Sequence, residues 1–241
     1  MAKKGGRNRM KRLSAPRLWD LERKKKRFTF KPTPGPHSIA KSYPLGVLLR
    51  DLVGLVKTAG ELRYAVNAGK VLVDGRVRRT PSFPVGLFDV VTIPSENLSL
   101  RLVPSPRGLI PSKIAKEEAE KKLCAVSSKV IVRGGRLRYG FHDGRSMAGE
   151  GLDLRPGDAV LMQLPDQRVL SEVRLAKESL ALVVSGERAG EVGRVLEVKK
   201  GTITRERMVK ISLPGGEAEI PSRLVFPVGI DKPAITVSIS R

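Results

Sequence analysis

The 241-residue sequence predicts a multi-domain α+β protein with a basic N-terminal extension, an α/β domain, a β-rich central domain and a small β-barrel. Three observations predict this class. Positive charge gathers at the N-terminus, two helical patterns precede a hairpin signal, and short apolar runs separated by turn residues fill the rest. The length allows one large domain or two to three small ones, and the composition shifts favour the second arrangement.

The N-terminal extension spans residues 1–42. It holds 14 Lys and Arg residues against two acids, so it carries 12 of the 22 net positive charges of the chain. Such a segment repels itself and cannot bury enough apolar surface to fold alone, so we expect it to bind a polyanion. Trp19 and Phe28 are interleaved with the charges. This mixture favours an arm that becomes ordered on its partner over a disordered solubility tail.

The isoelectric point of about 10.7 favours nucleic acid as that polyanion. An anionic membrane surface would call for an amphipathic helix, and prolines at 16, 32, 34 and 36 break helices in the arm. The sequence has no run of 18 apolar residues, and no apolar segment follows the charged N-terminus, so we expect a cytoplasmic protein. A single cysteine, Cys124, and two histidines predict no disulfide, no metal site and no cofactor.

Residues 43–105 form the first predicted folded domain. Pro44 suits the first turn of a helix, and leucines recur at near-helical spacing between residues 45 and 55. A capping box at Thr58 predicts a second helix, which Gly69 ends. A strand at 71–73, a tight turn at 74–75 and a return strand at 76–79 follow, with a further strand at 90–93.

Two more domains are predicted after it. In residues 106–172 a charged helix is expected over 112–123, followed by strands at 129–133, 137–141 and 159–164 with glycine-containing turns between them. In residues 173–241 short strands at 180–184, 192–198, 208–213 and 224–228 suggest a small barrel. The glycine-rich loop after the first of these strands is expected to project Arg188 outward.

Five basic side chains of residues 43–105 are candidates for one cationic face, because two helices and a hairpin can place them on one side. They are Arg63, Lys70, Arg76, Arg78 and Arg79. A catalytic site is not expected, since neither His37 nor His142 has a partner in a recognisable motif.

Several motifs occur in one order along the chain. These are Lys11-Arg12-Leu13-Ser14-Ala15-Pro16 followed by Trp19, Gly35-Pro36-His37, residues 69–75, His142-Asp143-Gly144-Arg145 and residues 183–195. In this combination the chain resembles the S-four-e family of archaeal and eukaryotic small-subunit ribosomal proteins. Residues 43–93 are similar to the S-four RNA-binding domain, and residues 183–195 resemble a KOW motif. The absence of a longer C-terminal extension resembles archaeal members.

The resemblance implies a structural protein that binds and stabilises small-subunit ribosomal RNA, located in the cytoplasm within the ribosome. Its implied partners are that RNA and neighbouring small-subunit proteins, with no membrane, no small-molecule substrate and no catalytic residue. The arm would thread into the RNA with Trp19 or Phe28 packed on riboses or bases. The expected RNA-binding residues are Lys3, Lys4, Arg7, Arg9, Lys11, Arg12, Arg17, Trp19, Arg23, Lys24, Lys25, Lys26, Arg27, His37, Arg63, Lys70, Arg76, Arg78, Arg79, His142, Arg145, Arg188 and Arg194.

Two other functions stay open at this point. The S-four-like domain also serves as a targeting module in RNA-modifying enzymes, and the KOW motif occurs in transcription elongation factors. Residues 151–153, Gly-Leu-Asp, lack the arginine of the Gly-Arg-Leu-Asp context that a pseudouridine synthase of the first kind needs.

Overall fold

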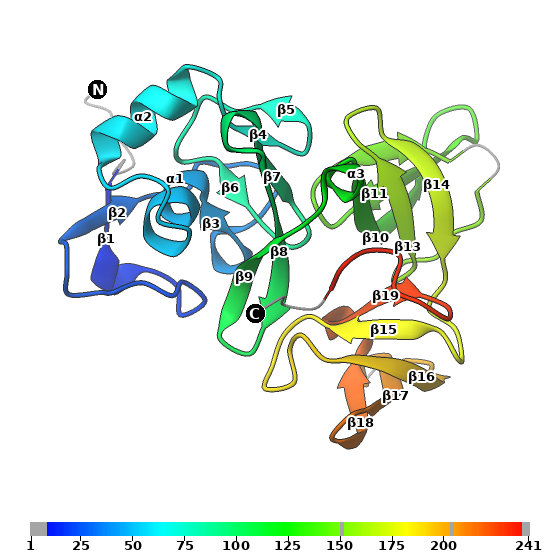
Figure 1. Cartoon of the computed structure of the whole chain (residues 1–241). Helices are drawn as coiled ribbons and strands as arrows, with labels where there is room; N and C mark the ends of the chain where they lie inside the picture. The colour runs from blue at the N-terminus through cyan, green and yellow to red at the C-terminus, as the bar shows by residue number, and fades with distance from the viewer. Residues whose placement is uncertain (1–8, 150–151, 203–204, 238–241) are drawn as a thin grey trace, which may run out of the picture.

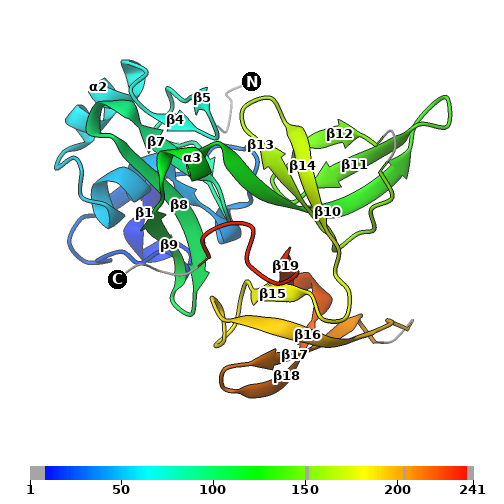
Figure 2. The same cartoon turned by 45° about the vertical axis from the view of Figure 1, so that its right-hand side comes forward.

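The computed structural model describes residues 9–149, 152–202 and 205–237. It contains three five-stranded antiparallel sheets, with the helices concentrated in the N-terminal third of the chain (Figure 1). Figure 2 shows the three sheets apart from one another. One belongs to residues 43–113, which we call the second domain; the sheet of residues 121–173 is the central sheet and the sheet of residues 180–229 is the C-terminal sheet. The predicted α+β class is confirmed.

The arm does not stand apart from the folded protein. Strands β1 (Arg9–Lys11) and β2 (Phe28–Phe30) pair antiparallel, and the short helix η1 (Arg12–Ser14) follows β1. Trp19 is only 2% exposed and shares a core with side chains of the next domain. The prediction that the arm takes its shape only on RNA is therefore wrong for residues 9–42. The following domain supplies the apolar surface that the arm lacks by itself.

The helices of the second domain begin where the sequence places them. α1 (Leu45–Val47) passes directly into a π-helical turn, η3 (Leu48–Leu52), so the helical segment ends three residues before Leu55, the last leucine of the near-helical spacing. α2 (Ala59–Asn67) begins with the predicted capping box: Thr58 Oγ1 accepts the Glu61 N–H at 3.2 Å, and the Glu61 carboxylate accepts the Thr58 N–H at 3.4 Å. Beyond the helix, Gly69 has φ +74°, the left-handed conformation that ends helices.

A five-stranded sheet completes this domain, in the order β5-β4-β7-β8-β9. Its strands are β4 (Leu72–Val73), β5 (Arg76–Val77), β7 (Val90–Ile93), β8 (Leu98–Ser105) and β9 (Gly108–Lys113). Asp74 and Gly75 have φ +52° and +73°, as a two-residue hairpin turn requires. A two-residue ladder joins β3 (Tyr43–Pro44) to β6 (Pro84–Val85), and η2 (Ile39–Lys41) and η4 (Pro94–Glu96) are short 3-10 turns.

The predicted charged helix over 112–123 is wrong. Only α3 (Lys116–Ala119) is helical; β9 precedes it and the long strand β10 (Lys121–Ile131) follows it. β10 pairs with β13 at its start and with β11 at its end, so long-range pairing overrides the local helical preference of the charged residues.

The central sheet has the order β12-β11-β10-β13-β14. The other strands are β11 (Leu137–Phe141), β12 (Ser146–Ala148), β13 (Ala159–Gln163) and β14 (Arg168–Val173). The predicted strands at 137–141 and 159–164 are confirmed, whereas β12 and β14 were not predicted.

The C-terminal sheet has the order β18-β17-β16-β15-β19. It consists of β15 (Leu180–Val183), β16 (Val192–Lys199), β17 (Met208–Leu213), β18 (Gly216–Pro221) and β19 (Val225–Gly229), with η5 (Ser222–Leu224) before the last. All four predicted strands are present, and β18 was missed.

A shared apolar core fixes the sheets against one another. Phe88, buried in the loop before β7, meets Phe226 of β19 edge to face, with ring centroids 4.9 Å apart. Leu123 of the central sheet and Val237 of the C-terminal tail belong to the same core. The tail is also tied to α3, because the Glu118 carboxylate accepts the Thr236 N–H and hydroxyl.

Candidate nucleic-acid interface

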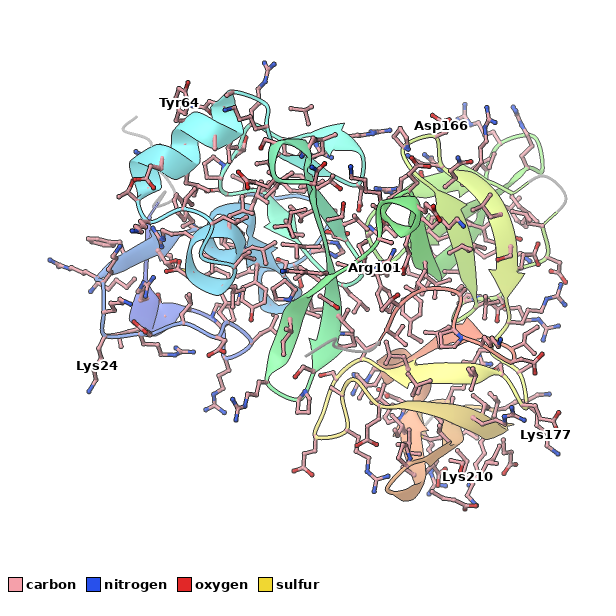
Figure 3. The ribbon with its side chains drawn as sticks, in the orientation of Figure 1. Lys24, Tyr64, Arg101, Asp166, Lys177 and Lys210 are labelled. Carbon is pink, nitrogen blue, oxygen red and sulfur yellow. The ribbon has the colours of Figure 1, made fainter. Side chains whose placement is uncertain are left out.

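The arm presents its positive charge on the loop between β1 and β2. Lys24, Lys25, Lys26 and Arg27 are exposed there, and Lys24 points away from the body of the protein (Figure 3). Arg23 instead folds back and donates to the backbone carbonyls of the η1 region at 3.1–3.3 Å. The loop therefore offers a cationic edge that a polyanion can reach.

Two of the predicted contacts in the arm lie inside the protein. The Trp19 indole N–H donates to the Ser42 carbonyl at 2.7 Å, and its ring stacks against Tyr43 with centroids 6.0 Å apart. Arg12 is 1% exposed and its guanidinium lies 2.5 Å from the Asp51 carboxylate. Neither side chain is available to RNA in this structure, so the prediction that Trp19 packs on a base is wrong.

The remaining arm residues divide into two groups. Lys11 and Arg17 are exposed. Lys3, Lys4 and Arg7, together with the side chain of Arg9, lie outside the described residues.

The cationic face of the second domain is set by local backbone structure. The capping box fixes the start of α2 and hence the position of Arg63, and the left-handed Gly69 turns the chain so that Lys70 leads into β4. Both side chains are exposed. The Lys70 ammonium lies 6.0 Å from the ring of Tyr64, the exposed aromatic at the top of α2 in Figure 3.

The β4–β5 hairpin and the two residues that follow it carry the other three basic residues of this face. Arg76 and Arg79 are exposed, whereas Arg78 is half-buried with its guanidinium 4.3 Å from the Phe83 ring centroid. A hollow of about 360 Å³ beside the hairpin is lined by Arg76, Arg78 and Arg145. The fold thus brings Arg145, from the turn after β11, next to arginines about seventy positions earlier.

Behind this hollow lies a buried ionic cluster, which we call the Lys122 cluster: Lys122, Asp74, Asp89, Asp143, Arg145 and His37. The Lys122 ammonium is fully buried and donates to Asp74 at 2.8 Å, Asp89 at 2.5 Å and Asp143 at 2.9 Å. Arg145 donates to Asp74 at 2.6 Å, and His37 pairs with Asp89 at 3.0 Å. The arm, the second domain and the central sheet meet at this one point.

In the Lys122 cluster, burial and the neighbouring charges shift the pKa of each group in opposite directions. Burial alone would raise the pKa of Asp89, but Lys122 and His37 outweigh it and hold that pKa far below its usual value. Burial would likewise lower the pKa of Lys122, and the surrounding carboxylates raise it well above normal. For Asp74 the effect of burial is larger than that of Lys122, so the pKa of Asp74 is raised. Lys122 therefore stays charged among at least two ionised carboxylates.

His142 lies beside the cluster as a neutral ring. Burial and the nearby Lys122 charge lower its pKa to about 4. Its Nδ1 faces the Ala125 N–H at 3.2 Å and its Nε2 faces the Leu87 carbonyl at 3.3 Å. In the neutral tautomer with the proton on Nε2, Nδ1 accepts and Nε2 donates, so both bonds are satisfied.

Of the predicted RNA contacts, His37 and His142 thus belong to the protein interior. Arg145 is held by Asp74 and Asp143 but keeps 17% of its side chain exposed and lines the hollow. Lys122, predicted to lie in a helix, and the acids Asp74, Asp89 and Asp143 were not predicted to form a site. No local motif marks Lys122. The only indication in the sequence is the alternation of side chains expected of the strand around it. The aspartates stand in or beside turns, where such residues are ordinary.

The glycine-rich loop between β15 and β16 is only partly exposed. Gly186 has open space around it at φ +104°, but Gly190, at φ +91°, lies so close to the β8–β9 turn that an added Cβ would come within 2.6 Å of the Pro104 carbonyl oxygen. The Arg188 guanidinium reaches back to the Gly216 carbonyl at 3.4 Å, and Arg194 of β16 is exposed. The expectation that this loop projects outward holds only for its first half.

In the described parts of the chain, none of the helices has the length and apolar character needed to cross a bilayer. Within the same residues, no group of three or more His, Cys, Asp or Glu side chains could hold a metal ion.

Comparison with known proteins identifies three family regions. Residues 4–40 match the RS4NT (NUC023) domain, residues 50–91 the S4 domain and residues 84–169 the ribosomal family S4e. The small ribosomal subunit protein eS4 of Ignicoccus hospitalis is 38% identical, covering 96% of this chain and 95% of that protein. The protein of the same name from Methanothermobacter thermautotrophicus is 37% identical, with 98% of each chain covered.

A solved structure agrees with these matches. The 30S ribosomal protein S4e of Thermoplasma acidophilum superimposes with a TM-score of 0.70 at 26% identity, covering 82% of this chain and 99% of that one. Together with the near full-length identity to archaeal eS4 proteins, this shows that the chain belongs to the ribosomal S4e family.

Proposed function

We propose that this protein is a structural component of the small ribosomal subunit that binds and stabilises small-subunit ribosomal RNA. The observation that carries the proposal is its 38% identity, over nearly the whole chain, to a protein named small ribosomal subunit protein eS4. The partners are that RNA and neighbouring small-subunit proteins, and the location is the ribosome in the cytoplasm. No catalytic role is part of the proposal.

The surface that binds RNA is made of exposed cations from two regions. One is the arm loop, with Lys24, Lys25, Lys26 and Arg27; the other is the face formed by Arg63, Lys70, Arg76 and Arg79. Lysine and arginine neutralise phosphates and release counterions, which makes such binding strongly salt-dependent.

The division into functional units is also part of the proposal. The basic extension comprises residues 1–42, the S-four-like domain 43–105, the central domain 106–172 and a KOW-type small barrel 173–241. Because β9 pairs with β8, residues 108–113 belong to the sheet of the S-four-like domain, so we place the boundary of that domain after Lys113 and not at residue 105. The left-handed glycines of the β15–β16 loop support the KOW assignment.

A salt titration of RNA binding tests the proposal. The full chain should bind small-subunit ribosomal RNA with an affinity whose logarithm falls by about 0.7–0.9 per phosphate contact for each tenfold rise in salt. The variant Lys24→Gln/Lys25→Gln/Lys26→Gln should flatten that slope by about 2. A control, Lys199→Gln/Lys210→Gln, removes cations paired with Glu219 and Glu217 on the C-terminal sheet and should leave the slope unchanged. An equal slope in wild type and the triple variant would contradict the role of the arm loop.

Fractionation of a cell lysate on a sucrose gradient gives an independent check. The protein is expected in the small-subunit peak at moderate salt. Co-sedimentation with RNA polymerase, or modified nucleosides appearing in precursor ribosomal RNA incubated with the protein, would overturn the proposal.

A further inference from the structure

The hairpin of β10 and β11 extends beyond the rest of the central sheet, and its turn points away from the other two sheets (Figure 2). Strand pairing continues to the turn, because the Val132 N–H donates to the Arg136 carbonyl at 2.9 Å. Gly134 and Gly135 close the turn with φ +85° and +71°, which glycine adopts without strain. The end of the hairpin is therefore held by the same ladder as the body of the sheet.

The two faces of this hairpin differ in what they contact. On one face Tyr139 is buried in the central core. The register places Val130 opposite Arg138, the neighbour of Tyr139, so these two side chains lie on the other face. Val132 and Arg136 follow two positions further along their strands and lie on that face as well. We call these four residues the hairpin face, and all four are exposed.

The hairpin face offers apolar surface. Val130 is 54% exposed and Val132 is 37% exposed. Small residues continue the face across β12, where Ala148 lies opposite Arg138 and Ser146 lies opposite a glycine. Valine suits any strand, so the valines by themselves do not indicate a partner. Their position beside small side chains means that a partner can reach them.

The hairpin is strongly basic. Between residues 127 and 148 the chain has five basic residues and one acid, Asp143. Asp143 is buried in the Lys122 cluster, where it also pairs with Arg145. Lys129 pairs with Asp153. Two of the five basic residues thus have an acidic partner, and the other three are the arginines at the end of the hairpin.

These three arginines, Arg133, Arg136 and Arg138, are exposed and form no ion pair with the described residues. Arg138 donates to the Ser146 hydroxyl at 2.9 Å. This hydrogen bond holds the guanidinium on the hairpin face, but a hydroxyl does not neutralise its charge. The face therefore combines accessible apolar surface with positive charge that the protein leaves uncompensated, and it favours a polyanion.

We propose that the hairpin face packs on the backbone of small-subunit ribosomal RNA. Phosphates accept hydrogen bonds from Arg136 and Arg138, since guanidinium groups match phosphate geometry. The riboses between the phosphates present C–H groups that pack on Val130 and Val132. This inference rests on the proposed function and adds a contact surface outside the arm loop and the second domain.

The first test is Arg136→Gln/Arg138→Gln in the full chain, titrated with salt against small-subunit ribosomal RNA. The salt slope should flatten by about 1.4–1.8 in total, the sum for two lost phosphate contacts. The melting temperature of the free protein should not change, because both side chains are exposed. The matched control is Arg174→Gln/Arg223→Gln, which removes two exposed arginines that already pair with glutamates and should leave the slope unchanged.

The second test is Val130→Thr/Val132→Thr. Threonine keeps the branched shape that strands favour, so the fold should be retained. RNA affinity should fall by about three- to tenfold because two methyl groups are no longer buried against the RNA. The salt slope should stay at the wild-type value, since no charge is removed. The control is Leu170→Thr in β14 of the same sheet, where Leu170 is 47% exposed, and this variant should bind like wild type.

The outcomes separate this inference from the proposed function. Wild-type slope and affinity in both hairpin variants, or equal losses in the controls, would overturn the hairpin face and leave the proposed function intact. If the variants bind free RNA like wild type but are lost from the small-subunit peak of a sucrose gradient, the partner is a neighbouring protein and the RNA contact is wrong. Failure of the wild-type protein to bind the RNA at all would overturn the proposed function together with this inference.

Discussion

Lys122 joins three distant parts of the chain through one buried ionic cluster. It is fully buried and contacts carboxylates from the β4–β5 turn, the loop before β7 and the turn after β11. Moving an ammonium group out of water costs free energy, and the three carboxylates offset that cost. The ammonium in turn stabilises the buried carboxylates. Removing it would leave three carboxyl groups in the interior with only Arg145 and His37 beside them.

We expect Lys122→Met to reduce the free energy of unfolding by about 3–5 kcal/mol, because breaking a buried ion pair leaves uncompensated charge. Urea denaturation measures this loss. The control Lys129→Met removes a lysine whose partner, Asp153, is exposed, and should leave the denaturation midpoint unchanged. A Lys122→Met protein as stable as wild type would show that the cluster does not hold the domains together.

Because of His142, the folded protein should lose stability in acid. Its pKa is about 4 in the folded protein, below the ordinary value of 6.5, so folding favours the neutral ring. The full contribution to stability is present above pH 6.5 and is lost as the pH falls from 6.5 to 4, about 3 kcal/mol in total. His142→Gln should lack this part of the pH dependence. Unfolding free energies at pH 7 and pH 4.5 give the comparison, and equal losses in both proteins would contradict the assignment.

At the scale of elements, α2 depends on its first turn. It has nine residues, too few to be stable alone in water, so its cap and its packing against η3 support it. The Thr58 hydroxyl satisfies one backbone N–H that would otherwise lack a partner within the helix.

We expect Thr58→Ala to reduce the free energy of unfolding by about 1 kcal/mol and to lower RNA affinity, because Arg63 depends on this helix for its position. Thermal denaturation and RNA binding give the two measurements. Ser185→Ala, in the exposed part of the β15–β16 loop, is the control and should change neither. Unchanged stability in Thr58→Ala would show that packing alone holds the first turn.

At the scale of the whole molecule, the arm is part of the fold as well as a source of charge. Trp19 and Ala15 are buried in the same core as Leu45 and Val73, and His37 reaches the Lys122 cluster. The arm thus connects the charge-bearing loop to the centre of the protein.

Trp19→Ala should therefore destabilise the whole protein by about 3–5 kcal/mol, the usual cost of deleting a buried aromatic side chain. Far-ultraviolet circular dichroism during urea denaturation measures it. Leu13→Ala is the control, because Leu13 lies in the same arm and is 70% exposed. A Trp19→Ala protein with wild-type stability would show that the arm does not contribute to the stability of the folded domains.

Local signals predicted local structure well. The capping box at Thr58, the left-handed Gly69 and the Asp74-Gly75 turn each depend on a few neighbouring residues, and the structure contains all three. The charged stretch 112–123 failed because its strands are fixed by partners far along the chain. Helical preference in such a stretch is weaker than the ladder and core contacts that a strand gains.

The sequence by itself determined the α+β class, the order of the motifs, the excess of positive charge in the first 42 residues and the family resemblance that the comparisons confirm. These follow from composition and from patterns within a few residues. Only the tertiary structure decided which charges face solvent. It placed Arg12 and Lys122 against aspartates inside the protein and left Lys24 and Arg63 outside. Burial and pairing depend on which distant segments meet, and residue type does not encode that.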